Sequence, residues 1–518
     1  MKKLVFLLGA VLVFLSCGDR ASKREEKDIA SIQKPNIVFI FSDDLSWGDL
    51  GVNGQVQFST PNIDKLAKEG LQFANAYAGA PECAPSRASL LTGKHLGHCR
   101  IRNNESVRGQ DHLLDEDVTI AEILKKVGYT TGYTGKWGVG MPGTEGVPHK
   151  QGFDYSFGFY DQLRGHGFYP HYLMENGKKV AIPENYGFDM KRTYKHTKAP
   201  EGLHTYDRYG KLIPDGIKDP SKAINSQDYI QEKALKFMQD NHENPFFLYY
   251  ATQLPHGPVI TPDISKFKDN SWDQKHKEWA AMMEHFDRHV GEITATLKEL
   301  DILENTLIVF AGDNGYSHWG YFGRKRWTDD PIFKNKGPWP YGKFIPRDGG
   351  VRVPMFAYWP GKIIPGTTKY ITALYDFMAT AAELAGAEET QSDGISIVPT
   401  LLGNPEKQQQ HKYLYWENSS VNPHAQSVRM EDYFAYRSHP DSLLEVYNVI
   451  KDPRCKTDIS KESKPIVEQV LAYMEEAHVD SKWFVNPGES KETIQAKMEE
   501  AKRTGTFYGS GTFPNTDY

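Results

Sequence analysis

Four oxygen-bearing side chains of this sequence have the chemistry of ligands for a hard divalent cation. Asp43 and Asp44 follow one apolar run, and Asp313 and Asn314 follow another. Carboxylate and amide oxygens suit Ca²⁺ or Mg²⁺, whereas zinc sites use histidine and cysteine, which this set lacks. A single Asp-Asp pair is often only a turn or a helix cap. Because three carboxylates gathered at one place would repel one another without a cation, we predict that these residues bind Ca²⁺, or less favourably Mg²⁺.

The second candidate for chemistry is the stretch 83–93, which reads C-A-P-S-R-A-S-L-L-T-G. It resembles the signature of the type I sulfatases, C-x-P-S-R-x-x-x-L-T-G, in which an enzyme oxidises the cysteine to Cα-formylglycine before the protein folds. The matching positions are Cys83, Pro85, Ser86, Arg87, Leu91, Thr92 and Gly93. A cysteine here could instead be only a small buried side chain. The length of the match favours the sulfatase interpretation, with a formylglycine-generating enzyme as a partner.

The resemblance implies a particular reaction at position 83. A hydrated aldehyde carries two hydroxyl groups on one carbon. One can attack sulfur, and the other can later lose its proton and expel sulfate, which restores the aldehyde. A thiol has no such route, because its sulfate adduct cannot collapse in the same way. The expected activity is therefore hydrolysis of sulfate esters by covalent catalysis.

The same resemblance assigns roles to four further side chains. Arg87 and Lys136 match family residues that orient the formylglycine and bind the sulfate, and Lys343 matches a lysine that stabilises charge developing on oxygen. His256 matches the histidine usually assigned to protonating the leaving alcohol, which its near-neutral intrinsic pKa suits. In the family, the residues matching the four oxygen ligands hold calcium beside the formylglycine, so we include Cys83 in the predicted metal site.

The sequence departs from the family pattern at two positions. The family commonly reads G-K-W-H-x-G, but here Gly138 follows Trp137, so the histidine that contacts the formylglycine hydroxyl is missing. Solvent or another histidine must replace it, and His166 is our first candidate. Asp348 stands where a glutamate is usual, a conservative change that we expect outside the reacting groups. The predicted substrate-binding residues are Lys136, His166, His256, His318 and Lys343.

The candidate residues follow runs that are typical of buried strands. Residues 36–41, 246–251 and 306–311 are continuous apolar runs, as expected for strands buried on both faces of a parallel sheet, and 129–134 is a shorter, more polar candidate. In open α/β sheets, ligands bind at the carboxyl ends of the strands. These four runs would therefore direct Asp, His, Asp/Asn and Lys side chains toward one edge.

Helical patterns lie between the predicted strands. Residues 119–122 have the form of a capping box, and an apolar stripe over 275–300 predicts a long helix that packs on the core. Alternating strands and helices indicate an α/β fold with a mostly parallel sheet. The resemblance implies an alkaline-phosphatase-like catalytic domain, which we place at 35–403.

After residue 403 the pattern changes. Short alternating runs at 413–416, 428–437 and 444–448 predict antiparallel strands, and 466–477 predicts a helix. Sulfatases carry a small C-terminal α+β subdomain at this place. We therefore assign 404–518 to such a subdomain, and we expect the last thirty residues to form an extended, polar tail.

The N-terminus has the pattern of a secreted bacterial lipoprotein. Two lysines precede an apolar run at 4–15 that is too short to span a bilayer, which predicts a signal peptide at 1–17. The run ends at Cys17, the expected site of a lipid anchor, unless the signal is a plain secretory one. Residues 18–34 would be a flexible tether. We therefore expect the bacterial cell envelope, the periplasm or the outer-membrane surface, where Cys99 and Cys455 could pair.

Composition narrows the partners. A net charge of −6 over 518 residues gives no electrostatic basis for binding nucleic acid. The segment 316–341 mixes aromatic and basic side chains, which would suit an anionic polysaccharide but could equally pack the segment onto the sheet. The segment 166–172, rich in histidine and tyrosine, would line the other side of the pocket.

We therefore expect a lipid-anchored sulfatase that acts on a sulfated oligo- or polysaccharide. Two alternatives remain. One is a phosphonate or phosphodiester hydrolase of the same superfamily, some members of which use the same cysteine motif. The other is a catalytically inactive, surface glycan-binding lipoprotein, which the histidine missing after Trp137 makes conceivable.

Overall fold

The computed structural model describes residues 34–162, 164–185, 205–206, 212–213, 223–388 and 391–507. The predicted signal peptide, Cys17 and all but the last residue of the predicted tether lie outside these ranges. The residues that the structure describes all belong to one compact unit. Within the described part of the chain, no helix has the length and apolar character needed to cross a bilayer.

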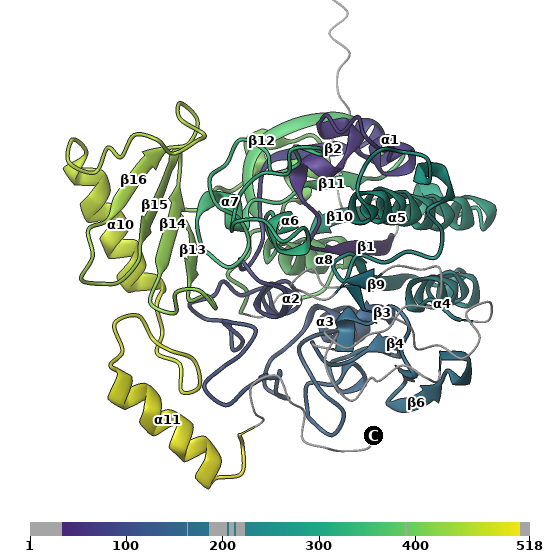
Figure 1. Cartoon of the computed structure of the whole chain (residues 1–518), viewed down its shortest axis with the longest axis horizontal. Coiled ribbons are helices and arrows are strands. Elements are labelled where there is room, and N and C mark those ends of the chain that lie inside the picture. Colours follow the sequence, from purple (N-terminus) through teal and green to yellow (C-terminus); the bar gives the residue numbers. More distant parts are fainter. Residues whose placement is uncertain are drawn as a thin grey trace, which may run out of the picture. The chain divides into compact units, whose positions relative to one another are not determined.

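A ten-stranded sheet forms the centre of this unit, in the order β12-β2-β11-β10-β1-β9-β3-β4-β5-β6 (Figure 1). The five neighbours β10, β1, β9, β3 and β4 run parallel. The strands are β1 (Asn36–Asp43), β2 (Leu71–Tyr77), β3 (Thr130–Lys136), β4 (Tyr155–Phe159), β5 (Tyr172–Glu175), β6 (Lys178–Ala181), β9 (Phe246–Pro255), β10 (Thr306–Gly312), β11 (Met355–Tyr358) and β12 (Gly366–Ala373). The predicted mostly parallel α/β sheet is confirmed.

Helices cover both faces of the sheet, as the continuous apolar strands require. On one face, Val38 and Ile40 of β1 join a core cluster with residues of the helices α1, α4 and α5. On the other face, the Phe39 ring lies 4.5 Å from that of Phe377 in α8. The larger helices are α1 (Pro61–Glu69), α2 (Cys83–Thr92), α3 (Ile120–Lys126), α4 (Ser226–Asn241), α5 (Gln274–Glu299) and α8 (Asp376–Ala385). The predicted capping box is present, since Thr119 and Glu122 exchange side-chain to backbone hydrogen bonds at the start of α3.

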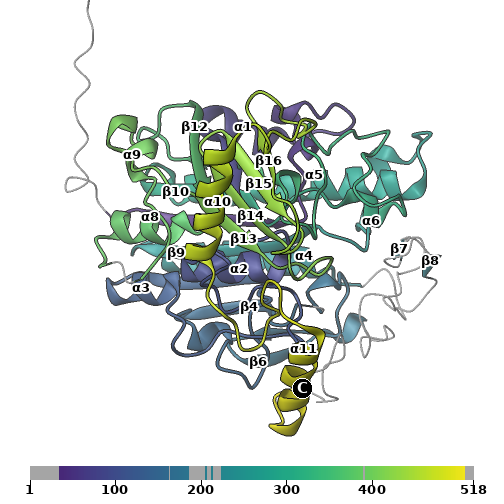
Figure 2. The ribbon, with the colours of Figure 1, turned by 90° about the vertical axis from the view of Figure 1, so that its left-hand side faces the viewer.

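The predicted C-terminal subdomain is an antiparallel sheet of four strands with one helix across it (Figure 2). The strands are β13 (Leu414–Glu417), β14 (Gln426–Met430), β15 (Tyr433–Arg437) and β16 (Glu445–Asn448), and the helix is α10 (Lys464–Ala477). Val470, Met474 and Ala477 of α10 pack on this sheet. Shorter elements complete the described chain: β7 (Thr205–Tyr206), β8 (Leu212–Ile213), α6 (His318–Tyr321), α7 (Asp348–Val351) and α9 (Val398–Leu401).

One expectation for this half of the chain is wrong. The expected extended tail contains the helix α11 (Lys491–Arg503), which begins at Ser490, whose hydroxyl accepts a hydrogen bond from the Thr493 amide. Lys497 fastens this helix by donating to the carbonyls of Ser481 and Phe484. Whether Cys99 and Cys455 pair was left open by the sequence, and in the described structure both are free thiols.

The stability of the central sheet should depend on Gly135, which precedes the last residue of β3. Its φ is +119°, and a Cβ there would lie 1.9 Å from the carbonyl oxygen of Ala251 in β9. We expect Gly135→Ala to lower the free energy of unfolding by on the order of 3 kcal/mol or more, measured by thermal or urea unfolding.

Gly366→Ala is the matched control, because Gly366 has open space where a Cβ would be added. Its melting temperature should stay close to that of the wild type. Equal melting temperatures for Gly135→Ala and the wild type would contradict the close approach of the two strands.

Candidate active site

The carboxyl ends of neighbouring strands carry the predicted site residues to one edge of the sheet. Asp43 ends β1, Lys136 ends β3, His256 follows β9 and Asp313 follows β10. These strands are adjacent in the order β10-β1-β9-β3, with Ser42 of β1 level with Gly312 of β10. The predicted convergence at one edge is confirmed in the described structure.

Cys83 is the first residue of α2 and lies against this edge. Its side chain is buried, with Sγ 3.3 Å from Asp43 Oδ1, 3.6 Å from Asn314 Oδ1 and 3.1 Å from Lys343 Nζ. Burial raises the pKa of the thiol above its usual value, and Asp43 adds to the effect. An unmodified Cys83 would therefore stay protonated and be a poor nucleophile at neutral pH.

Three buried carboxylates and three buried cations surround Cys83. Lys136 Nζ lies 2.6 Å from Asp43 Oδ2, and Lys343 Nζ lies 2.6 Å from Asp44 Oδ1. Arg87 lies 3.1 Å from Asp313 Oδ2 and 3.6 Å from Asp43 Oδ2. These six side chains are almost inaccessible to solvent. Buried charges of this kind persist only when they are paired or bind an ion.

Two of the carboxylates, Asp43 and Asp44, have lowered pKa values, whereas the third, Asp313, has a raised pKa. Burial alone would raise the pKa of Asp43, but Lys136, His256 and Arg87 hold it well below its usual range. Asp44 is held low in the same way, chiefly by Lys343. Burial and the charge of Asp43 raise the pKa of Asp313 to about 7. An additional cation beside Asp313 would therefore stabilise the charged form of its carboxylate.

The donor set fits a hard metal ion. Ligand atoms of Asp43, Asp44, Cys83 and Asp313 all lie within 4.8 Å of one another. The backbone at Asp44 has a φ of +62°, and its amide donates to Asp313 Oδ1 at 3.0 Å. Strained backbone of this kind is often found at functional sites. Apart from the sulfur, which stands where formylglycine oxygen would be, all donors are oxygens, as Ca²⁺ and Mg²⁺ require.

Two stacked histidines form one side of the cluster. The rings of His166 and His256 lie 3.9 Å apart and nearly parallel. His166 Nε2 lies 2.9 Å from Lys136 Nζ, and His256 Nε2 lies 3.5 Å from Asp44 Oδ2. Burial lowers the pKa of His256 to about 4, so its ring is neutral at pH 7 in the free protein. His166 thus lies beside Lys136 and His256, and its predicted replacement of the missing histidine stays a prediction.

The missing histidine at position 138 has a structural counterpart that the sequence did not reveal. Gly138 has a φ of +80°, and a Cβ added there would lie 2.6 Å from Gln162 Oε1 and 3.3 Å from Arg87 Cδ. Gln162 is buried, and its amide fills the space that a side chain at 138 would need. A lone glutamine carries no signal in the sequence, so only the tertiary structure identifies it.

Other predicted residues lie outside the cluster. His318 is fully buried against Asn335, Trp279 and Asp49, so its predicted contact with substrate has no support in this geometry. Asp348 pairs with Arg352 at 3.2 Å, outside the reacting groups as expected.

Two aromatic features also differ from the sequence prediction. From the segment 166–172, only His166 is among the groups around Cys83 described above, since Phe168 and Tyr169 belong to the core. Tyr321, which lies in the segment 316–341 predicted to bind a polysaccharide or to pack on the sheet, donates a hydrogen bond from its hydroxyl to Asp44.

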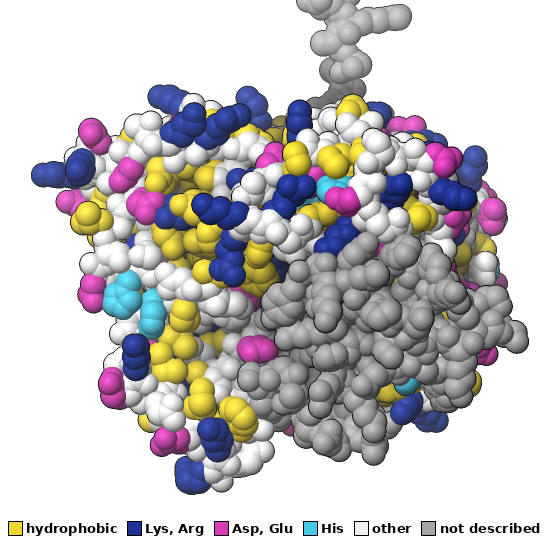
Figure 3. Space-filling view, viewed as in Figure 1, with side chains coloured by type: hydrophobic (Ala, Val, Ile, Leu, Met, Phe, Trp, Pro, Cys, Tyr) yellow, Lys and Arg dark blue, Asp and Glu magenta, His cyan; other side chains and the backbone are white. Residues whose placement is uncertain are grey.

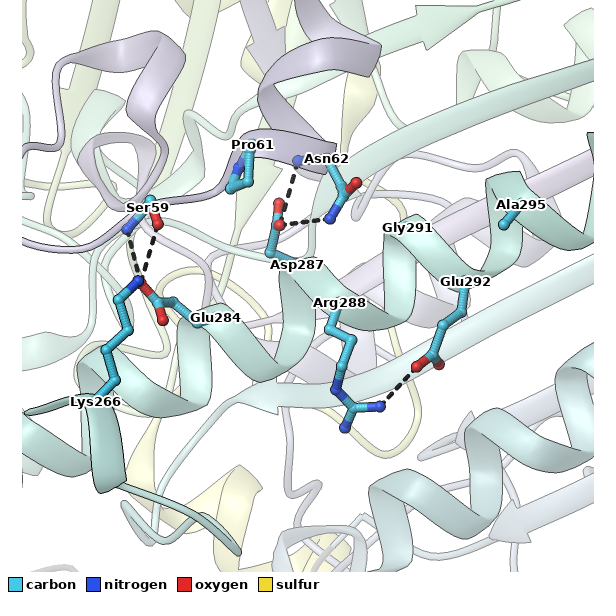
Figure 4. Close-up of a pocket in the computed structure, with 10 residues that line it drawn as sticks. All are labelled: Ser59, Pro61, Asn62, Lys266, Glu284, Asp287, Arg288, Gly291, Glu292 and Ala295. Carbon is cyan, nitrogen blue, oxygen red and sulfur yellow. Dashed lines mark hydrogen bonds and ion pairs between the residues drawn. The ribbon is translucent and has the colours of Figure 1, made fainter.

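A separate pocket lies between α1 and α5 and shares no residue with the cluster (Figure 4). The polar groups along it already pair: Asn62 with Asp287, Lys266 with Glu284, and Arg288 with Glu292. These pairs leave the pocket without a group poised for chemistry, so the cluster around Cys83 is the candidate active site.

Comparison with known proteins agrees with this assignment. The family model described as Sulfatase matches residues 35–387. An N-acetylgalactosamine-6-O-sulfatase of Bacteroides thetaiotaomicron is 28% identical, over 92% of this chain and 98% of that protein. The human N-acetylgalactosamine-6-sulfatase is 31% identical, over 71% of this chain and 66% of that protein.

Solved structures give the same result for the fold. The structure of Ps i-CgsB in complex with k-i-k-neocarrahexaose has a TM-score of 0.71 and 26% identity, over 92% of this chain and all of that one. The PsFucS1 sulfatase from Pseudoalteromonas sp. has a TM-score of 0.64 and 26% identity, over 86% and 90% of the two chains.

The carboxylate cluster predicts a stability that depends on Ca²⁺. Chelation should lower the melting temperature, and Ca²⁺ should restore it. The effect should be larger at pH 8 than at pH 6, because ion binding must displace the proton that Asp313 retains below a pKa of about 7. Differential scanning calorimetry at the two pH values measures this.

Asp43→Asn should abolish the Ca²⁺ response. Asp228→Asn is the matched control, because Asp228 is a carboxylate in a different cluster, with His285 and His289. It should keep the full response. A wild type indifferent to Ca²⁺, or an unchanged response in Asp43→Asn, would argue against the predicted ligands.

Proposed function

This chain belongs to the sulfatase family, and we propose that it hydrolyses sulfate esters of a carbohydrate with a formylglycine made from Cys83 and a bound Ca²⁺. One observation carries the proposal. The Cys83 side chain lies within 3.3 Å of both a buried carboxylate, Asp43, and a buried lysine, Lys343. A proposed metal ligand, Asp43, and a cation, Lys343, thus both contact the side chain that would react.

Formylglycine, once formed, supplies a hydroxyl nucleophile in place of the thiol. The Sγ atom of Cys83 marks the position that its oxygens would take. Lys343 there would stabilise negative charge on oxygen, and Arg87 would hold Asp43 and Asp313 in place. Lys136, between Asp43 and His166, would bind the sulfate.

Charge balance supports an anionic substrate. Asp43, Asp44 and Asp313 offset the three cations Arg87, Lys136 and Lys343. A divalent ion held by the carboxylates would leave the site with excess positive charge. Because the site is buried, that charge would act strongly on the sulfate group of the substrate.

His256 would act on the leaving group. Its ring is neutral in the free protein because of burial, and it lies beside Lys136 and Asp44. Binding of an anionic sulfate ester would raise its pKa and so favour the protonated form that can donate to the departing alcohol oxygen. His166, stacked on His256, would keep that ring in position.

A carbohydrate substrate is favoured by the similar proteins. The bacterial and human relatives are named for N-acetylgalactosamine sulfates, and the structure of Ps i-CgsB contains a neocarrahexaose. We extend to this chain only the class of substrate, a sulfated oligo- or polysaccharide.

The cellular setting is a proposal from the N-terminal sequence. Residues 1–17 would be a lipoprotein signal peptide that leaves a lipid on Cys17, with 18–34 as the tether. The mature protein would then work in the bacterial cell envelope. It would depend on a formylglycine-generating enzyme that acts on the chain before folding, since Cys83 is buried in the folded protein.

Turnover of an aryl sulfate and an aryl phosphodiester tests the proposed activity. The protein should be produced in a host that matures sulfatases. We expect sulfate release to exceed phosphodiester cleavage by orders of magnitude, and Cys83→Ala to abolish it. Cys99→Ala, which removes another buried thiol, is the control and should stay active. Preferred phosphodiester cleavage would support the alternative hydrolase, and glycan binding without sulfate release would support an inactive relative.

The proposed role of His256 predicts a dependence on the leaving group. His256→Ala should slow release of sulfate from a sugar roughly a hundredfold or more, but should slow release from 4-nitrophenyl sulfate much less, because nitrophenolate departs without a proton. The rate constants kcat for the two substrates measure this. His242→Ala, at a partly exposed histidine outside the cluster, should change neither rate. Equal slowing of both substrates would show that His256 is not the proton donor.

A further inference from the structure

A row of aromatic side chains leads away from the reacting centre. We call it the aromatic ridge and define it as Phe344, Trp319, Trp327 and Tyr341. Lys343 Nζ, which contacts Cys83 Sγ, lies 5.3 Å from the centre of the Phe344 ring. The Phe344 ring lies 6.2 Å from that of Trp319, and Trp327 lies 5.1 Å from Tyr341.

Arg326 joins the two halves of the ridge. Its guanidinium lies 5.4 Å from the Trp319 ring and 5.7 Å from the Trp327 ring. Arg326 is exposed, and it makes no ion pair within the described residues. The neighbouring Arg324, by contrast, is paired with Asp330 at 3.0 Å. Arg326 is therefore a cation held in place by aromatic rings but left free to meet an anion.

The backbone of the ridge is strained. Trp327, Tyr341 and Phe344 have φ values of +60°, +65° and +74°, in the left-handed region that bulky residues rarely adopt. Each such residue costs of order 1 kcal/mol and persists only where its surroundings fix it. Strain at three aromatic residues of one surface indicates that their positions serve a function beyond packing.

Hydrogen bonds hold two of these strained residues, Trp327 and Phe344, and connect them to the reacting centre. Trp327 Nε1 donates to the carbonyl of Lys343 at 3.0 Å, and the Phe344 amide donates to the carbonyl of Pro81 at 3.0 Å. Pro81 lies two residues before Cys83. The ridge is thus held by the same two segments that carry the nucleophile and its lysine.

The surface at this place has the matching character. In the region of α6 and α7, Lys and Arg side chains lie beside exposed apolar side chains (Figure 3). Phe344, Trp319, Trp327 and Tyr341 are each half-buried and so offer part of each ring to a ligand. Other aromatic residues of the 316–341 segment, such as Phe333, instead pack in the core.

We propose that the aromatic ridge and Arg326 form a binding subsite for a second anionic group of the substrate. The apolar faces of sugar rings would lie on the half-buried aromatic rings, and a sulfate or carboxylate on a neighbouring sugar would pair with the Arg326 guanidinium. This inference rests on the proposed function. It narrows the substrate to an oligosaccharide with at least two anionic groups and makes Arg326 a specificity-determining residue.

Matched substrates of different length test this subsite. The wild type and Arg326→Ala are assayed on 4-nitrophenyl sulfate, a chondroitin 6-sulfate hexasaccharide and a sulfated neocarrahexaose, each hexasaccharide beside its sulfated monosaccharide. We expect the wild type to have a higher kcat/KM for one of the two hexasaccharides than for the matching sulfated monosaccharide. Arg326→Ala should lower kcat/KM for that hexasaccharide roughly tenfold, mainly through KM, and should leave 4-nitrophenyl sulfate unchanged.

Two variants separate charge and geometry from general effects. Lys325→Ala removes a neighbouring cation that is also exposed, and it should leave kcat/KM unchanged for both the hexasaccharide and 4-nitrophenyl sulfate. Arg326→Lys keeps the charge but lacks the planar guanidinium, so its kcat/KM for the hexasaccharide should lie between the values for the wild type and Arg326→Ala. The difference between wild type and Arg326→Ala should shrink at high salt.

Three results would overturn the subsite: equal effects of the two alanine variants, equal loss on 4-nitrophenyl sulfate, or a wild type that cleaves 4-nitrophenyl sulfate but prefers neither hexasaccharide. In each case the proposed sulfatase activity would stand, because the wild type still releases sulfate.

Discussion

The structure depends on keeping three carboxylates, Asp43, Asp44 and Asp313, buried at one edge of a sheet. Such a cluster is unfavourable by itself, and Arg87, Lys136 and Lys343 reduce the cost by direct ion pairs. The raised pKa of Asp313 is the part of the cost that these cations leave uncompensated. A divalent cation would offset this cost. The same cluster of carboxylates that destabilises the protein without an ion would therefore bind the ion, and the ion would help to bind the sulfate.

The rest of the fold holds this cluster in register. Parallel neighbours β10, β1, β9 and β3 end at the same level, and close approach at Gly135 brings Lys136 beside Asp43. The C-terminal subdomain makes hydrogen bonds to the segment that precedes Cys83. Ser420 donates two hydrogen bonds to the buried Glu82, which precedes Cys83, and Trp416 Nε1 donates to the carbonyl of Ala78 at 2.9 Å. The small sheet thus braces the start of α2 instead of forming an independent module.

Sequence reasoning succeeded where local patterns determine structure. Three buried apolar runs and one more polar run predicted the four central strands. The residues at or directly after the ends of those strands had to meet, because parallel strands end at one edge. It failed where placement depends on distant contacts. His318 lies a few residues from Asn314, yet its ring faces Asn335 and Trp279. Gln162 fills the space beside Gly138, and Tyr321 reaches Asp44, through tertiary packing that no spacing encodes. The helix α11 was not predicted because its sequence is mostly polar. Its local signal was the capping residue Ser490.

The central claim is that the residue at position 83 reacts as an aldehyde beside a cation held by these carboxylates. Peptide mass spectrometry of the segment containing residue 83, on protein with full sulfate-releasing activity, tests it most directly. The account predicts that this residue has the mass of formylglycine, and that the modified fraction rises in proportion to specific activity across preparations. A fully active preparation in which Cys83 keeps an unmodified thiol would contradict it.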